Sequence, residues 1–192
     1  VLCSSVMQMQ IEKQGTNRLK PVRIMVPVNL RKLAGSRTLR NFSLYCLPTM
    51  EGQHHSLSLK ELCQVIGKQM QEQLSPESLS GMASYNVRMQ NLWFFKILPW
   101  KIKSAALRFG YRFRGESNSS LTLTNLGILK LPEELLPHVA DFQCYMTPRM
   151  GSPYGCTIMT FGDKLTLNMS RFCPEDQLGK RYFEKILSVL EG

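Results

Sequence analysis

The sequence predicts an α/β fold, a two-layer sandwich in which helices pack mainly on one face of a mixed β-sheet. Strand-like stretches outnumber the helices that would connect parallel strands, so both strand directions are expected. Gly162-Asp163 separates two alternating stretches, which is the pattern of a two-residue hairpin. With 43% hydrophobic and 20% charged residues, the 192-residue chain is expected to form a single domain, residues 1–192.

The first half of the chain contains two clear helical patterns. An opening helix is expected to run to about Lys13. Ser58 and Glu61 then have the spacing of a capping box, in which each residue satisfies a backbone N–H of the other. The apolar residues that follow recur at helical spacing and predict one stripe that covers the sheet: Leu59, Leu62, Cys63, Ile66, Met70 and Leu74.

Further helices are predicted by start signals and breakers. Ser75-Pro76 predicts a capped helix that continues to about Gln90. Two short helices broken at Pro99 are expected next, and residues 131–137 allow only one helical turn. The last helix is expected to begin at Pro174 and to bury one stripe: Tyr182, Phe183, Ile186, Leu187 and Leu190.

Six strands are predicted from β-branched composition and alternation: residues 22–31, 41–48, 119–127, 141–146, 155–161 and 164–170. Pro27 lacks an N–H, so the end of the first strand is expected to be an edge or a bulge. A two-residue hairpin at Gly162-Asp163 places Ile158 opposite Leu167 and Cys156 opposite Met169. One face of this hairpin is therefore expected to be apolar.

The strand over residues 119–127 is the centre of the predicted site. Leu121 and Leu123 are expected to face the core, while Thr122 and Thr124 line the opposite face with hydroxyls. Asn125 and Gly127 tolerate left-handed backbone, so the strand is expected to end there in an irregular loop, where a ligand commonly sits. The alternative is a surface strand with a solvated polar face.

Composition narrows the class of protein. No stretch reaches the roughly 18 apolar residues that cross a bilayer, and no secretory signal is recognisable. The six cysteines contain no CxxC pair, so we expect no metal site and interpret them as buried thiols in a reducing, cytoplasmic compartment. The opening residues, 1–10, look like a helix entered midway, so a fragment of a longer protein is expected.

The charge is unevenly distributed. The net charge of +10 favours an acidic partner. Residues 96–114 contain no acidic side chain but six basic ones, interleaved with aromatic residues: Lys96, Lys101, Lys103, Arg108, Arg112 and Arg114. This segment, which includes Trp100, is expected to form a surface for a membrane or a lipid-like acceptor. Nucleic acid is not an expected partner, because no recognised motif accompanies the charge.

Four motifs occur in a recognisable order along the chain: residues 26–31 (Val-Pro-Val-Asn-Leu-Arg), 41–44 (Asn-Phe-Ser-Leu), 120–127 (Ser-Leu-Thr-Leu-Thr-Asn-Leu-Gly), and the Gly162-Asp163 hairpin with the final helix. In this order, they resemble the C-terminal half of the chloramphenicol acetyltransferase-like superfamily of CoA-dependent acyltransferases. Alcohol acetyltransferases, wax ester synthases and condensation domains are the most similar members. The resemblance implies the C-terminal lobe of a two-lobed enzyme, with an acyl-thioester channel between the lobes.

The resemblance also implies roles for individual residues. Thr122, Thr124, Asn125 and Gly127 are expected to line the substrate channel, although the second, proline-containing turn of the wax ester synthases is not reproduced here. Structural anchors beside the channel are expected at Arg31 and Asn41. Coenzyme A thioester, or an acyl group on phosphopantetheine, is the implied donor, and an alcohol or amine the acceptor.

The catalytic base of that superfamily is a histidine in an HHxxxDG motif. Here His54-His55 is followed by Ser56-Leu57-Ser58, without the required Asp and Gly, and the pair is interpreted as a solvated loop. His138 is interpreted as structural. The expected base therefore lies on an N-terminal lobe outside this chain, and an isolated lobe is expected to self-associate. The alternative function is a non-catalytic binding module with the same fold.

Overall fold

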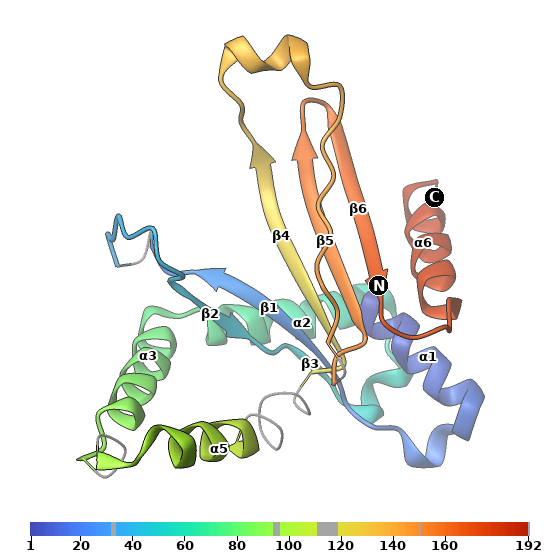
Figure 1. Ribbon diagram of the computed structural model, residues 1–192. Helices are drawn as coiled ribbons and strands as arrows, with labels where there is room; N and C mark the ends of the chain where they lie inside the picture. Colours follow the sequence, from blue (N-terminus) through green and yellow to red (C-terminus); the bar gives the residue numbers. More distant parts are fainter. Residues whose placement is uncertain (32–33, 94–96, 111–118, 150, 192) are drawn as a thin grey trace.

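A computed structural model of the protein describes residues 1–31, 34–93, 97–110, 119–149 and 151–191. It contains one mixed six-stranded sheet with the order β2-β1-β4-β5-β6, and β3 also pairs with β1 (Figure 1). The strands are β1 (Val22–Asn29), β2 (Ser43–Cys46), β3 (Thr49–Met50), β4 (Leu121–Leu129), β5 (Tyr154–Phe161) and β6 (Lys164–Arg171). β1, β4 and β5 are parallel, while β2, β3 and β6 are antiparallel to their neighbours. The predicted mixed sheet is confirmed.

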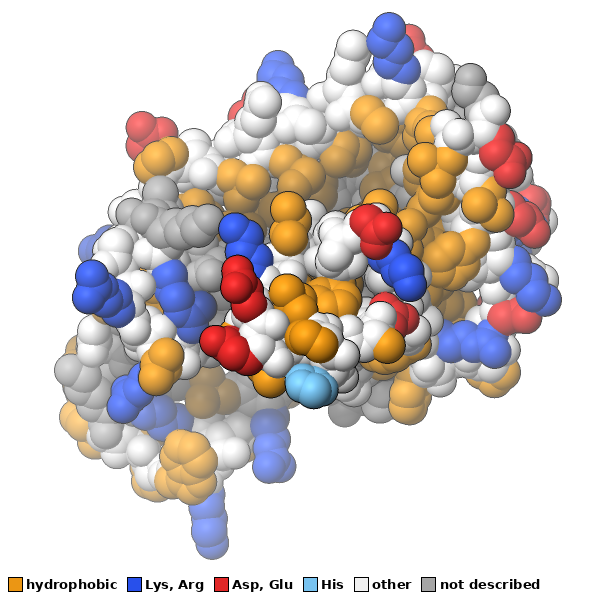
Figure 2. All heavy atoms as spheres, turned by 90° about the horizontal axis from the view of Figure 1, so that it is seen from above, with side chains coloured by type: hydrophobic (Ala, Val, Ile, Leu, Met, Phe, Trp, Pro, Cys, Tyr) orange, Lys and Arg blue, Asp and Glu red, His pale blue; other side chains and the backbone are white. Residues whose placement is uncertain are grey.

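Helices α1, α2 and α6 pack on one face of the sheet, which confirms the two-layer arrangement. The helices are α1 (Leu2–Gln14), α2 (Leu59–Gln73), α3 (Pro76–Gln90), α5 (Trp100–Gly110) and α6 (Gln177–Leu190), with 3₁₀ turns η1 (Thr16–Arg18), η2 (Gly52–Ser56) and η4 (Glu133–His138). No helix among the described residues is both long enough and apolar enough to span a bilayer. Seen from above, hydrophobic side chains gather around a hollow beside the tips of the strands (Figure 2).

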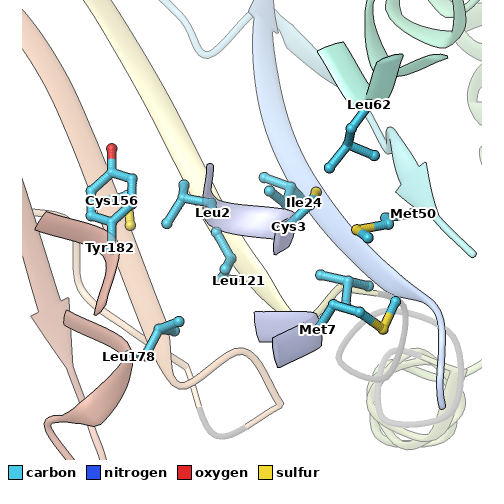
Figure 3. Close-up of a cluster of buried hydrophobic side chains, with 11 residues drawn as sticks. Leu2, Cys3, Met7, Ile24, Met50, Leu62, Leu121, Cys156, Leu178 and Tyr182 are labelled. Carbon is cyan, nitrogen blue, oxygen red and sulfur yellow. The ribbon is translucent and has the colours of Figure 1, made fainter. Parts of the chain in front are cut away.

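The core lies between the three helices and the lower half of the sheet (Figure 3). Met7 of α1, Val22 of β1 and Leu121 of β4 are at most 1% exposed. Leu62 of α2 and Leu178 of α6 complete contacts from the other two helices. Burial of each such side chain contributes about 1.5–3 kcal/mol, so this cluster accounts for the docking of all three helices.

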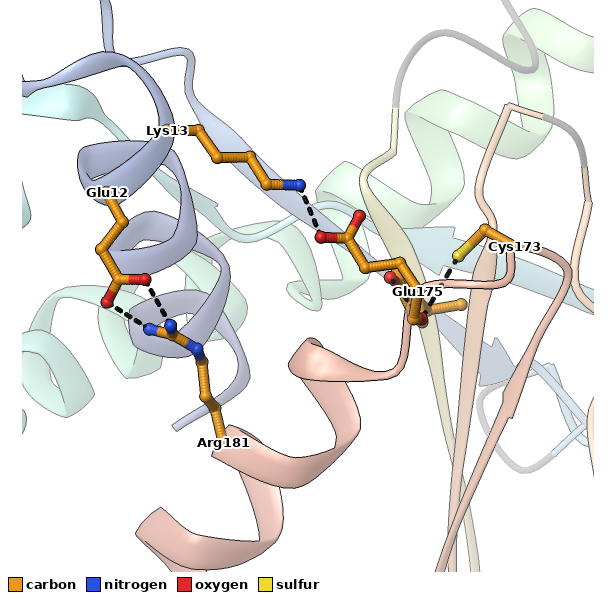
Figure 4. A network of polar contacts seen from close by, with 6 residues as sticks. Glu12, Lys13, Cys173, Glu175 and Arg181 are labelled. Carbon is orange, nitrogen blue, oxygen red and sulfur yellow. Dashed lines mark hydrogen bonds and ion pairs between the residues drawn. The ribbon is translucent and has the colours of Figure 1, made fainter.

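Ion pairs hold α6 against α1 at the rim of this core (Figure 4). The guanidinium of Arg181 pairs with both carboxylate oxygens of Glu12, and this hydrogen bonding lowers the pKa of Glu12. Lys13 Nζ lies 2.6 Å from Glu175 Oε1, in the connection before α6. Both pairs are exposed to solvent, so they orient the two helices more than they stabilise them.

The predicted capping box of α2 is confirmed. Ser58 Oγ accepts a hydrogen bond from the backbone N–H of Glu61, whose carboxylate accepts from the N–H of Ser58. At the sheet side, the amide of Gln69 exchanges hydrogen bonds with both backbone groups of Thr49, at 2.7 and 2.9 Å. The side-chain amide of Gln69 thus pairs with β3 as the backbone of a neighbouring strand would, and this pairing fixes α2 beside the sheet.

The predicted hairpin is also confirmed. Ile158 lies opposite Leu167 and Cys156 opposite Met169. Gly162 has a φ of 60°, whereas no described residue other than glycine, Asp163 included, has a positive φ. A turn with positive φ only at its first central position is type II′, as the Gly-Asp sequence predicts.

Two predicted strand features are wrong. Residues 141–146 form no strand; they run in extended form across the sheet face opposite the helices. Their carbonyl groups are bonded by side chains, since Thr157 Oγ1 and Asn168 Nδ2 donate to the Cys144 oxygen, at 2.5 and 3.0 Å. Strand β4 does not end in a loop at residues 125–127, because it continues to Leu129 through a bulge between Asn125 and Gly127.

The start and the exposure of the last helix, and the burial of the cysteines, also differ from the predictions. Pro174 precedes α6 by three residues, since Asp176 occupies the N-cap position. Tyr182 is buried as predicted, but Leu187 and Leu190 are 55% and 76% exposed because no described element covers that side of α6. All six cysteines are free: three are buried (Cys3, Cys46 and Cys156), Cys63 is exposed, and Cys144 and Cys173 lie between.

Candidate functional site

The candidate site begins where β1 and β4 separate. These parallel strands pair only at Ile24–Leu121 and Met25–Thr122. Beyond Met25, β1 pairs with β2, whereas β4 pairs with β5, and the two arms diverge (Figure 1). We call the diverging residues, 26–29 of β1 and 123–129 of β4, the fork.

Two local features account for the fork. Pro27 has no N–H to donate toward β4, which confirms the edge predicted for this end of β1. On β4, the bulge at Leu126 bends the strand, and Gly127 adopts a φ of 69° there. Within the described ranges, no strand pairs with the edges of β1 and β4 that face the fork. Backbone donors and acceptors are therefore available to a ligand along both arms.

An apolar cavity of about 380 Å³ lies on the helix face at the base of the fork. Ile24 of β1 and Leu123 of β4 form its floor, and α1, α2 and α6 supply its walls. The wall residues are Val1, Leu2, Cys3, Leu59, Leu62, Cys63, Ile66, Gly67, Met70, Tyr182 and Ile186. Its size falls within the range of small-molecule pockets, and its lining suits a hydrocarbon group.

One wall position of the cavity is unusual. A Cβ added to Gly67 of α2 would meet no atom within 4 Å. Glycine inside a helix costs about 0.5–1 kcal/mol relative to alanine. The absence of a side chain at Gly67 therefore leaves part of the cavity open, and any larger residue at this position would begin to fill it.

Burial keeps the nearby acidic groups neutral. Desolvation raises the pKa of the Cys3 thiol to about 11 and that of the Tyr182 phenol to about 12. The same effect raises the pKa of Cys156, which belongs to the buried core cluster, to about 12. These three groups are therefore uncharged at neutral pH.

Arg149 lies on the opposite face at the same position along the strands. Its Nη2 is 3.4 Å from both Thr122 Oγ1 and Met25 Sδ, the last pair before the fork opens. Sequence reasoning missed this residue, because an arginine in a Pro- and Gly-containing loop gives no periodic signal. It places a positive charge at the base of the fork.

The structure divides the four predicted channel residues between two faces. Thr122 is buried against Arg149, and Thr124 lies half-buried on the same face. Asn125 lies on the helix face with Leu123, since their register partners are Ile158 and Cys156. Asn125 Oδ1 accepts from the backbone N–H of Gly127 at 2.8 Å, so its amide NH₂ is the group that it can offer to a ligand.

Arg31 and Asn41 lie beside the end of β1. The guanidinium of Arg31 donates to the carbonyl oxygens of Thr38 and Arg40, at 2.8 and 2.7 Å. Asn41 Oδ1 accepts from Ser43 Oγ at 2.7 Å, at the start of β2. These bonds fix the connection between the strands.

The three histidines lie outside the fork. His54 Nδ1 accepts from the N–H of Glu51 at 3.2 Å, and His55 Nδ1 lies 2.9 Å from the Gly52 oxygen. Both belong to η2, so they form a 3₁₀ turn rather than the predicted loop, and His138 is exposed at the end of η4. Among the residues that the structure describes, no three His, Cys, Asp or Glu side chains are grouped to hold a metal ion.

The predicted basic surface corresponds to α5. Trp100, Lys101 and Arg108 are exposed on this helix, and Lys103 is half-buried. The other three basic residues of the predicted segment, Lys96, Arg112 and Arg114, fall outside the described residues. Pro99 directly precedes α5, while part of the first of the two short helices predicted here, residues 94–96, lies outside the described residues.

Comparisons with known proteins assign no family to the chain. No family model matches it, and no curated protein sequence matches it. Among solved structures, it is similar to the crystal structure of vinorine synthase, with a TM-score of 0.46 and 12% sequence identity. That similarity covers 93% of this chain and 37% of the length of vinorine synthase.

Proposed function

We propose that this chain is one lobe of an acyltransferase that moves an acyl group from a thioester to an alcohol or amine. The observation that carries the proposal is the apolar cavity at the base of the fork, beside two strand edges with unpaired backbone groups. An acyl chain needs an apolar space, and the amides of a pantetheine arm need backbone partners. The two requirements meet at one position in this fold.

The polar residues at the fork support the same chemistry. Attack on a thioester carbonyl places negative charge on its oxygen, which hydrogen-bond donors then stabilise. Asn125 lies on the same face of β4 as the cavity residue Leu123 and can offer its amide NH₂, and Arg149 contributes positive charge from the opposite face. A coenzyme A or phosphopantetheine thioester is the donor that fits this combination of apolar and cationic groups.

The attacking alcohol or amine must lose a proton to a base. None of the three histidines lies at the cavity. We therefore propose that a histidine from a lobe outside this chain is the base. The placement of the histidines also favours a second candidate function, a module of this fold that binds acyl thioesters without transferring the acyl group.

Gly67 provides the test of acyl binding. Gly67→Leu fills the cavity from α2, so we expect the affinity of the chain for a long-chain acyl-CoA to fall at least about tenfold, because most of the apolar contact is lost. Gly81→Leu on α3 is the matched control, since its Cβ also meets no atom within 4 Å and lies away from the cavity. Isothermal titration calorimetry with acyl-CoA and with free CoA measures both. Equal affinity in all three proteins would remove the cavity from the proposal.

Turnover separates the two candidate functions. The enzyme hypothesis predicts that the protein with its histidine-bearing lobe releases free CoA from acyl-CoA when an alcohol is present, as measured by mass spectrometry. It also predicts that Asn125→Ala lowers this rate while the protein remains folded, as checked by circular dichroism. Binding without release of CoA would instead support the binding module.

A further inference from the structure

Helix α5 carries an apolar stripe that faces solvent. Ile102, Ala105, Ala106 and Phe109 recur at the spacing of one helix face. All four are exposed, Ile102 to 56% and Phe109 to 66%. In a surface helix of a globular protein such a stripe normally faces the core, whereas no described side chain of α5 is buried.

Cationic side chains border this stripe on both sides. At 100° per residue, Lys101 and Arg108 fall on one flank of the stripe and Lys103 falls on the other. Long cationic side chains at these positions can lay their methylene groups along an apolar surface and extend their charges to its polar boundary. Residues 92–115 contain no acidic side chain, so the charge of the segment is wholly positive.

Both tryptophans of the chain belong to this region. Trp93 and Trp100 are 73% and 75% exposed. Tryptophan is favoured at the boundary between lipid and water, where its ring is buried and its N–H stays hydrated. In Figure 1, α3 and α5 project away from the layer of α1 and α6, and Figure 2 shows blue and orange side chains mixed at the lower left, where these helices lie.

We propose that α5 binds the surface of an anionic lipid bilayer, with Ile102 and Phe109 inserted among the acyl chains and the cations at the head groups. Charge complementarity selects this partner, because each Lys or Arg near an anionic bilayer contributes attraction. A protein partner fits less well, since lysine is depleted in the cores of protein interfaces. The proposal is independent of acyl transfer.

Tryptophan fluorescence tests the proposal without a label. Trp93→Phe and Trp100→Phe together with Phe109→Trp leave one tryptophan reporter, which lies on the exposed apolar stripe of α5. We expect its emission to shift to shorter wavelength with vesicles of phosphatidylcholine and phosphatidylserine, and the shift to weaken at high salt. Within this background, Lys101→Glu with Arg108→Glu is expected to lower vesicle affinity at least about tenfold.

The matched control reverses two charges on α2, as Lys60→Glu with Lys68→Glu, which changes the net charge by the same amount at exposed positions. Its vesicle affinity should fall much less than that of the α5 variant. Equal losses in both variants would show that net charge alone acts, and would overturn the proposal. So would an unchanged spectrum with anionic vesicles, or a shift that depends on protein concentration without lipid. Thermal melts of each variant exclude unfolding as the cause.

Discussion

At the scale of single residues, the proposed site depends on residues that weaken or bend a regular helix or strand. Gly67 weakens α2 yet leaves the cavity open, and Gly127 allows β4 to bend at the fork. Asn125 uses its own oxygen to hold that bend, which leaves its amide NH₂ for other partners. Each of these residues links the local backbone to the proposed site.

Replacement of Gly127 tests the bend directly. A Cβ at a φ of 69° costs about 1–2 kcal/mol, although no neighbouring atom lies within 4 Å of it. Gly127→Ala is therefore expected to lower the free energy of unfolding by that amount, measured by urea denaturation. Gly81→Ala, inside α3, should instead raise it by about 0.5–1 kcal/mol. A neutral Gly127→Ala would show that the bend is not held at this residue.

At the scale of elements, the residue pattern predicted the features that depend on interactions between residues close together in the sequence. The capping box at Ser58 and the register of the β5–β6 hairpin were predictable, because each depends on residues close together in the sequence. The stripe of α6 was predicted, but its exposure was not, since periodicity shows which residues share a face and not whether another element covers it. The same reason explains residues 141–146, whose alternation is compatible with an extended segment bonded by side chains.

The cap of α2 gives a prediction at this scale, since α2 forms one wall of the cavity. Ser58→Ala removes the side-chain acceptor of the first turn, which costs about 1 kcal/mol. The Ser58 hydroxyl also lowers the pKa of Glu61. Loss of this hydroxyl should therefore lower stability at pH 7 and move the Glu61 pKa upward in an NMR titration. An unchanged Glu61 pKa would argue against the capping box in solution.

At the scale of the whole molecule, the fork joins segments almost a hundred residues apart through two paired positions. Sequence reasoning found the strands and Asn125, but it placed Asn125 in one channel with Thr122 and Thr124. In the structure, Asn125 lies on the opposite face of β4 from the two threonines. It could not find the cavity or Arg149, because both arise only when α1, α2, α6 and the loop before β5 converge on the fork.

The buried acidic groups predict how the whole domain responds to alkali. Burial raises the pKa of Cys3 from 9.0 to about 11 and that of Cys156 from 9.0 to about 12. Above pH 9 the unfolded chain loses these protons while the folded chain keeps them, so stability falls as pH rises. Each thiol contributes a slope of about 1.4 kcal/mol per pH unit in this window.

Urea denaturation between pH 7.5 and 10.5 measures this slope. We expect little change below pH 8.5 and a steady loss of stability above pH 9. Cys156→Ala should be less stable at every pH but should show a smaller slope, because one of the buried thiols is gone. A slope that Cys156→Ala leaves unchanged would contradict the burial of this thiol.

The most direct test of the central claim is to locate a bound acyl chain. A long-chain acyl-CoA with a photoreactive diazirine on the acyl chain can be cross-linked to the protein, and the modified peptides identified by mass spectrometry. The account predicts labels on the cavity walls, in the peptides that contain Leu62 and Ile66 of α2 and Leu123 of β4, with loss of these labels in Gly67→Leu. Labels confined to other surfaces, or labels that Gly67→Leu leaves unchanged, would contradict the assignment of this cavity as an acyl site.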